Sequence, residues 1–304
     1  MAIITPSLLT NLNTGFRADF QDAFDQARAR SLYQRIATIV PSATASNTYG
    51  WLGQFPGFRE WIGDRVIQDM AADGYQIVNK TWESTVGVKR TDIEDDLMGV
   101  YRPLMAEMGR AAAVFPDEQI FALLKAGEST LCYDGQNFFD TDHPVYPNVD
   151  GTGTAVNVSN LAAGAEPNPW YLLDVSRMLR PLIYQERKAP FFTAMTRPDD
   201  EQVFTANEYR YGVDLRANVG FGFWQMAYKS KVTLNAANYA AARAAMGGYK
   251  ADGGRPLGIV PNLLLVPPAL EGAARTVVGA QLEGGGGTNP WYNTAEVVVC
   301  PWLA

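Results

Sequence analysis

The stretch TDIEDDLMGVYRPLMAEMGRAAAVFPDEQIFALLKAG, residues 91–127, carries the longest helical pattern in the sequence. It opens on a capping box, in which the Thr91 hydroxyl accepts from the backbone N–H of Glu94 and the Glu94 side chain reaches back. Apolar residues then recur at helical spacing: Leu97, Val100, Leu104, Met108, Ala111 and Phe115. Pro103 and Pro116 should kink or divide the helix, because proline removes a backbone donor and clashes with the preceding turn. The stretch therefore predicts a long, kinked helix of about 30 residues.

A second amphipathic pattern lies near the start of the chain. Its apolar residues recur every four positions: Leu8, Leu12, Phe16, Phe20 and Phe24. This spacing places them on one stripe of a helix. Such a helix either packs on the core of its own domain or docks as an arm on a neighbouring subunit, and periodicity alone favours the first alternative. Residues 33–40 then predict a strand that stops at Pro41.

The segment between these two helices predicts a β-ribbon. Two strands are expected, over residues 65–70 and 75–89, joined through the turn signal Asp73-Gly74. The segment also holds three of the seven tryptophans: Trp51, Trp61 and Trp82. A two-stranded ribbon is marginal alone, so it must lean on its parent domain or on another chain.

Downstream of the long helix the sequence becomes rich in loops and then in strands. Residues 130–168 are rich in Asp, Asn, Gly and Pro, which favours loops, and residues 170–234 predict mainly strands. The remaining patterns predict a helix over 238–246, a strand over 263–266, a helix over 269–280 and a strand over 296–300. The predicted class is α+β.

Composition excludes several classes of protein. The chain has 304 residues, 47% of them hydrophobic, which is enough for a sizeable core and predicts about two domains. Its net charge of -7 argues against a broad basic face that grips nucleic acid. Only 19% of the residues are charged, and extensive contact between subunits would account for that. Neither a targeting segment nor a run of about 20 apolar residues is visible, so we expect a soluble, intracellular product without a membrane span.

Groups that could carry chemistry gather between Cys132 and His143, together with Asp134, Asp140 and Asp142. A Cys–His nucleophile needs the thiol within hydrogen-bond reach of the imidazole. The alternative is turn chemistry, with aspartates that bond to the backbone and a cysteine that serves as a small buried apolar residue. The second interpretation is favoured, so no catalytic residue is predicted. A hydrolase that uses Cys132 and His143 stays as the alternative.

No metal or cofactor site is predicted either. Residues Asp140, Asp142 and His143 offer three ligands at most, and their spacing does not match a calcium loop. A single histidine excludes every site that needs two imidazoles. The sequence contains no Gly-Lys-Ser/Thr, and Gly220-Phe-Gly222 does not continue as a dinucleotide-binding motif.

Several longer motifs, in one order along the chain, resemble a known family. They are YQRIATIVPS (33–42), YGWLGQFP (49–56), VGVKRTDIEDD (86–96), CYDGQNFFDTDHP (132–144), GFGFWQ (220–225) and GGRPLG (253–258). These motifs are similar to those of the Mu-like phage major head subunit, and the similarity continues to residue 304.

The resemblance implies a major capsid protein with the Hong Kong 97-type fold. On that map residues 1–47 are the N-terminal arm, 48–90 the extended β-hairpin called the E-loop, 91–235 the peripheral domain with its spine helix at about 91–127 and a β-rich block, and 236–304 the axial domain. The family pattern usually places a last peripheral strand set after the axial domain, whereas here the β-rich block comes before it.

The implied function is mechanical. Copies would form the pentamers and hexamers of an icosahedral head around double-stranded DNA, bound non-specifically, and the protein would be a virion component assembled in the host bacterial cytoplasm rather than an enzyme. Portal, scaffold or protease, and decoration proteins are the implied further partners, and no membrane is expected. The subunit-interface candidates are Phe16, Phe20, Trp51, Phe55, Trp61 and Trp82. A low-copy minor virion or adaptor protein is a further alternative.

Overall fold

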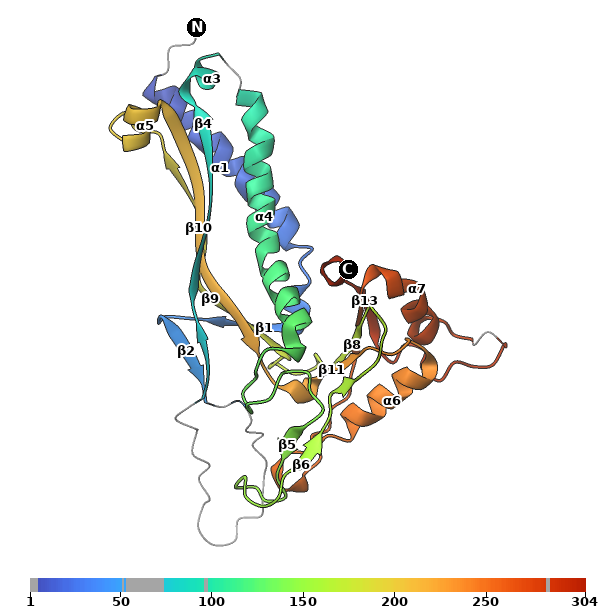
Figure 1. Cartoon of the computed structure of the whole chain (residues 1–304). Coiled ribbons are helices and arrows are strands. Elements are labelled where there is room, and N and C mark those ends of the chain that lie inside the picture. The colour runs from blue at the N-terminus through green and yellow to red at the C-terminus, as the bar shows by residue number, and fades with distance from the viewer. Residues whose placement is uncertain (1–4, 51, 53–73, 96–97, 283–284) are drawn as a thin grey trace.

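The computed structural model describes residues 5–50, 52, 74–95, 98–282 and 285–304. It has an elongated part, in which two long helices lie along one side of a long sheet, and a second part around another sheet beside its base (Figure 1). The helices are α1 (Pro6–Arg28), α2 (Tyr33–Ile36), α3 (Arg90–Glu94), α4 (Met98–Lys125), α5 (Glu201–Ala206), α6 (Ala236–Gly247) and α7 (Glu271–Ala274). The α+β class is confirmed.

Four sheets are formed by the described strands. The strands are β1 (Ala37–Pro41), β2 (Ser46–Tyr49), β3 (Tyr75–Val78), β4 (Lys80–Lys89), β5 (His143–Val145), β6 (Val156–Val158), β7 (Leu161–Ala162), β8 (Trp170–Leu173), β9 (Leu182–Met195), β10 (Glu208–Phe221), β11 (Ala227–Ser230), β12 (Leu263–Val266) and β13 (Glu296–Val299). The long sheet has the order β1-β9-β10-β4, and the second has the order β13-β12-β8-β11-β7. Two small sheets pair β2 with β3 and β5 with β6.

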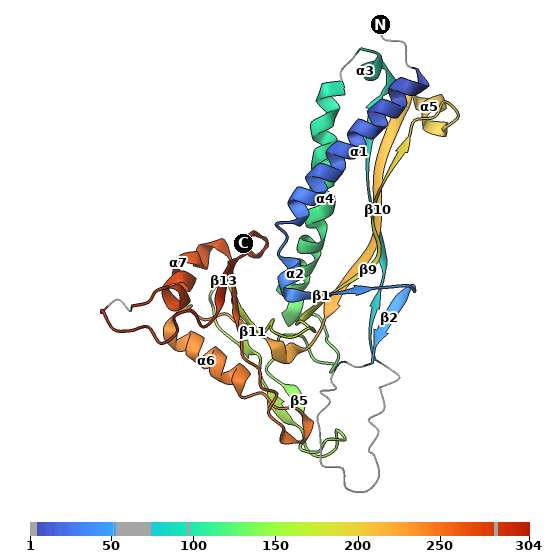
Figure 2. The same ribbon diagram turned by 180° about the vertical axis from the view of Figure 1, so that it is seen from behind.

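Helix α1 crosses α4 on the same side of the long sheet, as the view from behind shows most clearly (Figure 2). Its apolar stripe packs between α4 and strands β9 and β10, and Phe16 and Phe20 are buried there. At the crossing α4 carries Gly109, where a Cβ atom would lie 2.1 Å from the carbonyl oxygen of Phe20. Arg102 of α4 donates two hydrogen bonds of 2.8 Å to the carboxylate of Asp19 in α1. The two helices therefore dock through a close backbone contact and a bidentate ion pair.

The start of the long helix differs from the prediction. Thr91 lies inside the short helix α3, its hydroxyl contacts Asp92, and α4 begins at Met98, so the capping-box interpretation is wrong. Pro103 and Pro116 lie inside α4 without dividing it. Apolar packing along α4 outweighs the lost backbone bonds, because the helix is buried against α1 and the sheet.

The strand expected over residues 33–40 starts later than predicted. Residues 33–36 form the short helix α2, and the strand β1 begins at Ala37. The cause is a tertiary contact, since the buried carboxylate of Asp117 in α4 accepts from the backbone N–H groups of Leu32 and Tyr33 at 3.0 and 2.6 Å. A helical start is stabilised by such a partner for its free N–H groups.

The ribbon is also arranged differently. The strand expected over residues 75–89 is interrupted at Asn79: β3 pairs antiparallel with β2, and β4 pairs antiparallel with β10 of the long sheet. The other predicted strand, residues 65–70, lies outside the described residues. The predicted ribbon strand therefore pairs with strands of its own chain, β2 and β10.

The second sheet joins strands from both sides of residue 235. Strands β8 and β11 come from the predicted β-rich block, β7 from the segment before it, and β12 and β13 from the predicted axial segment. A boundary at 235/236 thus divides the strands of one sheet. Strands β9 and β10 of the same β-rich block belong to the long sheet instead. The segment 130–168, predicted as loops, contributes the short strands β5, β6 and β7.

The C-terminal predictions agree in element type. Helix α6 and strands β12 and β13 occupy the predicted positions, and the segment after β12 is an irregular run of helical turns that includes α7. Within the described residues, no helix is long and apolar enough to cross a membrane.

Candidate functional site

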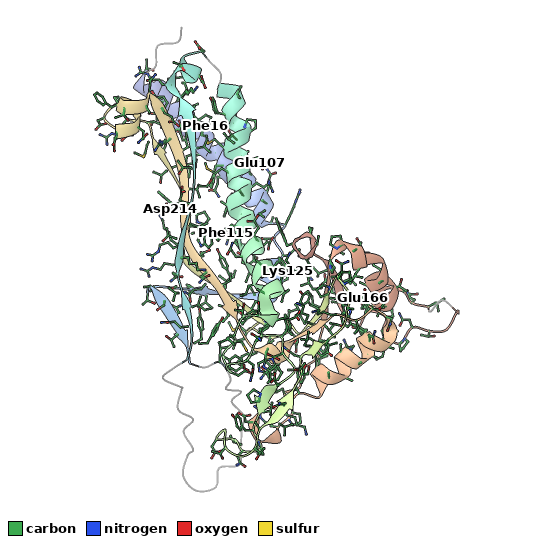
Figure 3. All side chains as sticks on the ribbon, in the orientation of Figure 1. Phe16, Glu107, Phe115, Lys125, Glu166 and Asp214 are labelled. Atoms are coloured by element: carbon green, nitrogen blue, oxygen red, sulfur yellow. The ribbon has the colours of Figure 1, made fainter. Side chains whose placement is uncertain are left out.

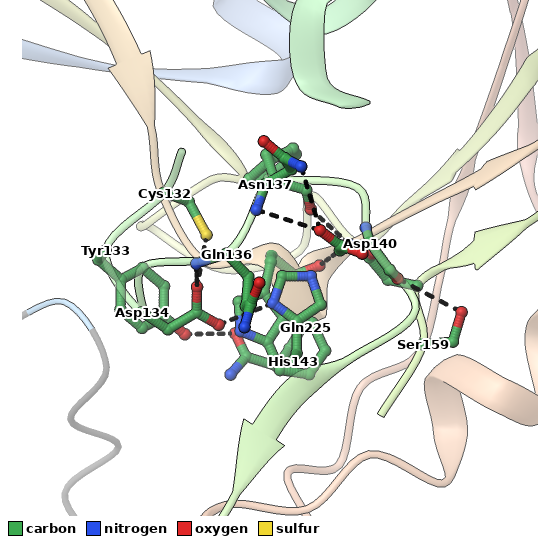
Figure 4. A network of polar contacts seen from close by, with 12 residues as sticks. Cys132, Tyr133, Asp134, Gln136, Asn137, Asp140, His143, Ser159 and Gln225 are labelled. Atoms are coloured by element: carbon green, nitrogen blue, oxygen red, sulfur yellow. Dashed lines mark hydrogen bonds and ion pairs between the residues drawn. The ribbon is translucent and has the colours of Figure 1, made fainter. Parts of the chain in front are cut away.

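The residues around Cys132 and His143 form a connected polar cluster next to the small β5–β6 sheet (Figure 4). Its centre is Asp134. One carboxylate oxygen, Oδ1, accepts from the Cys132 thiol at 3.0 Å and from the backbone N–H of Gln136 at 3.1 Å. The other, Oδ2, lies 2.7 Å from Nδ1 of His143. The turn is closed by a backbone bond of 2.8 Å from Cys132 to Gln136.

The cluster is shielded from solvent. Cys132 is buried, and His143 is 0% exposed with its ring stacked on Trp224, the centroids 4.0 Å apart. Burial raises the pKa of the Cys132 thiol, and the neighbouring carboxylate raises it further. Burial also acts to raise the pKa of Asp134, but the hydrogen bonds from His143 and Cys132 outweigh it and lower that pKa. The stable state is therefore an ionised carboxylate beside a protonated thiol.

This geometry does not make a nucleophile. In a Cys–His pair the imidazole takes the proton of the thiol, and a third group orients the imidazole. Here the carboxylate of Asp134 lies between the thiol and the imidazole and binds both. A thiol with a raised pKa is a poor source of thiolate. The arrangement thus stabilises a turn rather than a reactive sulfur.

The same three side chains bring potential metal ligands together. The ligand atoms of Cys132, Asp134 and His143 all lie within 4.8 Å of one another. A metal on Nδ1 would move the ring proton to Nε2, yet Nε2 is buried and has no hydrogen-bond partner among the described residues. Histidines that bind metals normally donate their second N–H to an acceptor. The donor set fits a hydrogen-bonded histidine with its proton on Nδ1 better than a metal ligand.

Asp140, the next acidic residue of the motif, also serves a turn. Asp140 accepts from the backbone N–H of Thr141 at 2.7 Å and from that of Asn137 at 3.3 Å. Its pKa is lowered, since these bonds and one from Asp142 outweigh the opposing effect of burial. Neither Asp140 nor Asp142 belongs to the group of potential metal ligands formed by Cys132, Asp134 and His143.

Three of the interface candidates lie within the described residues, and their side chains pack on their own chain. Phe16 is 1% exposed and meets the ring of Tyr211 edge-on, at 5.1 Å between centroids, and Phe20 is 3% exposed. Trp82 is half-buried, with its ring 5.0 Å from that of Phe115 and its Nε1 donating to the carbonyl of Ala217 (Figure 3 labels Phe16 and Phe115). Trp51, Phe55 and Trp61 lie outside the described residues.

Other apolar side chains are exposed. Phe204 of α5, at the far end of the long sheet, is 83% exposed, and Met178 in a loop is 92% exposed. Phe191 of β9 is more than half exposed, and so is Val100 of α4, which the sequence pattern had placed on the apolar stripe of the helix. Phe204 and Met178 are single apolar residues in short segments without a periodic pattern, so the sequence did not distinguish them.

Comparison with known proteins identifies the family. The family model described as Mu-like prophage major head subunit gpT matches residues 9–303. The chain belongs to this family. It is 48% identical to the major capsid protein of Escherichia phage Mu, over 99% of this chain and 100% of that protein. It is 51% identical to the Mu-like prophage FluMu major head subunit of Haemophilus influenzae, over 93% of this chain and 92% of that one.

Solved structures agree with the family. The chain matches one from the procapsid of bacteriophage JBD30 with a TM-score of 0.86 and 63% identity, covering 98% of this chain and 100% of that chain. It matches a chain from the JBD30 capsid with a TM-score of 0.76 and 49% identity, covering 100% of both. The chain is thus a major capsid protein of the Mu-like type with the predicted Hong Kong 97-type fold.

Proposed function

We propose that this major head subunit forms the pentamers and hexamers of a closed icosahedral head that encloses double-stranded DNA. The observation that supports this most is the match of residues 9–303 to the major head subunit family, together with the fold shared with the JBD30 procapsid chain. Burial of apolar area between subunits, at about 25 cal/mol per Å², would drive association against the ordering cost.

The domain map supplies the parts of this proposal. Residues 1–47 act as the arm, 48–90 as the E-loop, 91–235 as the peripheral domain and 236–304 as the axial domain. The boundary at 235/236 is the least sharp, because the second sheet contains strands from both sides of it. Trp51, Phe55 and Trp61 make contacts with a neighbouring copy through the E-loop. The cytoplasm of the host bacterium is the place of assembly, and portal, scaffold or protease, and decoration proteins are its further partners.

Packaged DNA is held without sequence preference. A subunit with a net charge of -7 supplies little attraction for phosphate, so the shell confines the genome rather than binding it. Tight, sequence-specific DNA binding by the unassembled subunit, insensitive to salt, would contradict this part of the proposal.

Negative-stain electron microscopy of the purified, concentrated protein tests assembly directly. Closed shells of uniform diameter are expected, with a particle mass of many subunits. A protein that stays monomeric, or that is present in only a few copies in particles from a lysogenic host, would instead be a minor virion or adaptor protein.

The protein works without catalysis. The Asp134-centred cluster supports this, because its thiol is buried and donates to a carboxylate. Replacing His143 by alanine separates the two functions: shells that still form while turnover of an ester or peptide substrate is lost would establish a hydrolase. We expect the wild type and the His143→Ala variant to show the same background rate of hydrolysis.

A further inference from the structure

A buried amide lies where the β2–β3 ribbon joins the long sheet. Gln185 belongs to β9, is 0% exposed, and pairs in register with Val40 of β1 and with Asn218 of β10. Strand β1 leads into β2, and the ribbon then projects away from the end of β1 (Figure 1). Gln185 therefore lies within the sheet at the base of the ribbon.

The side chain of Gln185 binds both strands of the ribbon. Its Oε1 accepts from the hydroxyl of Tyr49, the last residue of β2, at 2.7 Å. Its Nε2 donates to the carbonyl of Ile77 in β3 at 3.1 Å and to Oδ1 of Asn79 at 2.8 Å. Both amide hydrogens and the amide oxygen are thus used, and every partner lies in the ribbon or at its end.

Asn79 extends this connection to the start of the ribbon. Its Nδ2 donates to the Ser42 hydroxyl at 2.8 Å and to the Thr44 carbonyl at 2.9 Å. Its backbone N–H donates to the carbonyl of Ala45 at 2.9 Å. Asn79 therefore binds the segment between β1 and β2, and Gln185 in turn binds Asn79.

Directional bonds are needed here because the apolar contacts of the ribbon do not fix an angle. Tyr49 and Ile77 pack with Ile183, Phe223 and Met226 in a small cluster, and hydrophobic contact is not directional. Hydrogen bonds weaken steeply when their angles change. Two strands alone are also marginal in stability. Two other directional bonds join β10 to β3 alone, from Asn218 Nδ2 to the Val78 carbonyl at 2.7 Å and from the Phe221 backbone N–H to the Tyr75 hydroxyl at 3.1 Å. The Gln185 amide differs from them because it binds β2 and β3 together, and thereby holds the ribbon as a unit at one angle to the sheet.

The chain leaves and re-enters the ribbon at one point. A Cβ atom on Gly74 would lie 2.6 Å from Cα of Gly50, so the two backbones touch where β2 ends and β3 is about to begin. A rotation of the ribbon therefore displaces Gly50 and Gly74 together.

We propose that Gln185 is a positioning residue for assembly: by fixing the ribbon against β9 it sets where the E-loop meets a second copy of this chain. The inference rests on the proposed function, in which the E-loop contacts a neighbouring subunit. It assigns to one buried amide a role in shell geometry that is separate from its contribution to subunit stability.

The test compares two buried amides. Gln185→Met keeps the length of the side chain and removes all three hydrogen bonds. Asn289→Leu is the matched control: Asn289 is also buried and makes bonds of 2.8–2.9 Å to Val277, Ala280 and Trp291, in the C-terminal part of the chain away from the ribbon. Both full-length variants are compared with wild type for urea unfolding of the unassembled subunit and for particle yield and diameter by electron microscopy.

Both variants should lose subunit stability to a similar extent, but only Gln185→Met should replace shells of wild-type diameter by open or irregular ones. In the unassembled Gln185→Met subunit, amide hydrogen exchange should also rise in β2 and β3 while α6 stays protected. Wild-type shells from Gln185→Met at wild-type yield would overturn the inference, as would equal loss of shells in both variants. Failure of the wild type to form shells would overturn the proposed function instead.

Discussion

A glycine-to-alanine change in α4 should weaken the docking of α1. Alanine normally stabilises a helix interior relative to glycine by about 0.5–1 kcal/mol. At Gly109 the added Cβ would lie 2.1 Å from the Phe20 carbonyl oxygen and 3.1 Å from Phe20 Cα, and these backbone atoms cannot rotate away. Overpacking of this kind costs about 1–3 kcal/mol. We therefore expect Gly109→Ala to lower the free energy of unfolding by about 1–2 kcal/mol after the helix gain is subtracted.

The same substitution in α1 serves as the control. Gly15 lies inside α1, and a Cβ atom there would have no neighbour within 4 Å. Gly15→Ala should raise the free energy of unfolding by about 0.5–1 kcal/mol. Both values are measured by urea unfolding of the unassembled subunit, followed by tryptophan fluorescence and circular dichroism. If Gly109→Ala proves as stable as Gly15→Ala, the close helix crossing does not exist in solution and the reasoning fails.

Three further predictions concern the surface, an ion pair and the buried cluster. Phe204→Ser should change the free energy of unfolding by no more than about 0.5 kcal/mol, because the side chain is exposed, yet it should reduce the yield of shells. The neighbouring Val203 is buried, so Val203→Ala should lower the free energy of unfolding by about 1–2 kcal/mol. A normal yield of shells from Phe204→Ser would show that Phe204 is not part of the interface. Burial acts to raise the pKa of Glu128, but hydrogen bonds from Lys229 and Lys231 outweigh it and lower that pKa below its usual 4.5. Because the folded chain then binds fewer protons than the unfolded chain, this stability is present above pH 4.5 and is lost as the pH falls below it. The free energy of unfolding of Glu128→Gln should therefore depend less on pH below 4.5 than that of wild type, and parallel curves would contradict this. Asp134→Ala should cost about 3 kcal/mol or more because it leaves buried donors without an acceptor, whereas Cys132→Ser, which keeps a donor to Asp134, should cost much less, and equal thermal shifts would refute the turn interpretation.

Elements that depend on local pattern were predictable from the sequence. The stripe that contains Phe16 and Phe20 gave helix α1, and the apolar run at Leu263–Val266 gave β12, because in both cases the period of burial matches the element. Where the ends of elements depend on distant partners, the prediction failed. The helical turn at Tyr33 depends on the carboxylate of Asp117, which no local pattern reveals.

Strand pairing was predictable only in part for the same reason. The turn signal Asp73-Gly74 indicated a nearby ribbon, but β3 pairs with β2 and β4 pairs with β10. The break between β3 and β4 lies at Asn79, whose side chain and backbone bind the segment before β2 rather than the next strand. A polar residue that ends a strand by bonding elsewhere looks, in sequence, like any other residue of an exposed strand.

The candidate site shows how geometry decides between two uses of the same residue types. A thiol, a carboxylate and an imidazole do come together, but the carboxylate occupies the central position. With Asp134 between them, Cys132 and His143 both become hydrogen-bond donors to one anion, and the imidazole is fully buried and lies flat on Trp224. Residue types alone permit catalysis here, but the order of the contacts favours a buried turn that holds β5 beside the core. For a protein whose function is to keep one shape within a shell, a rigid turn is the more useful outcome.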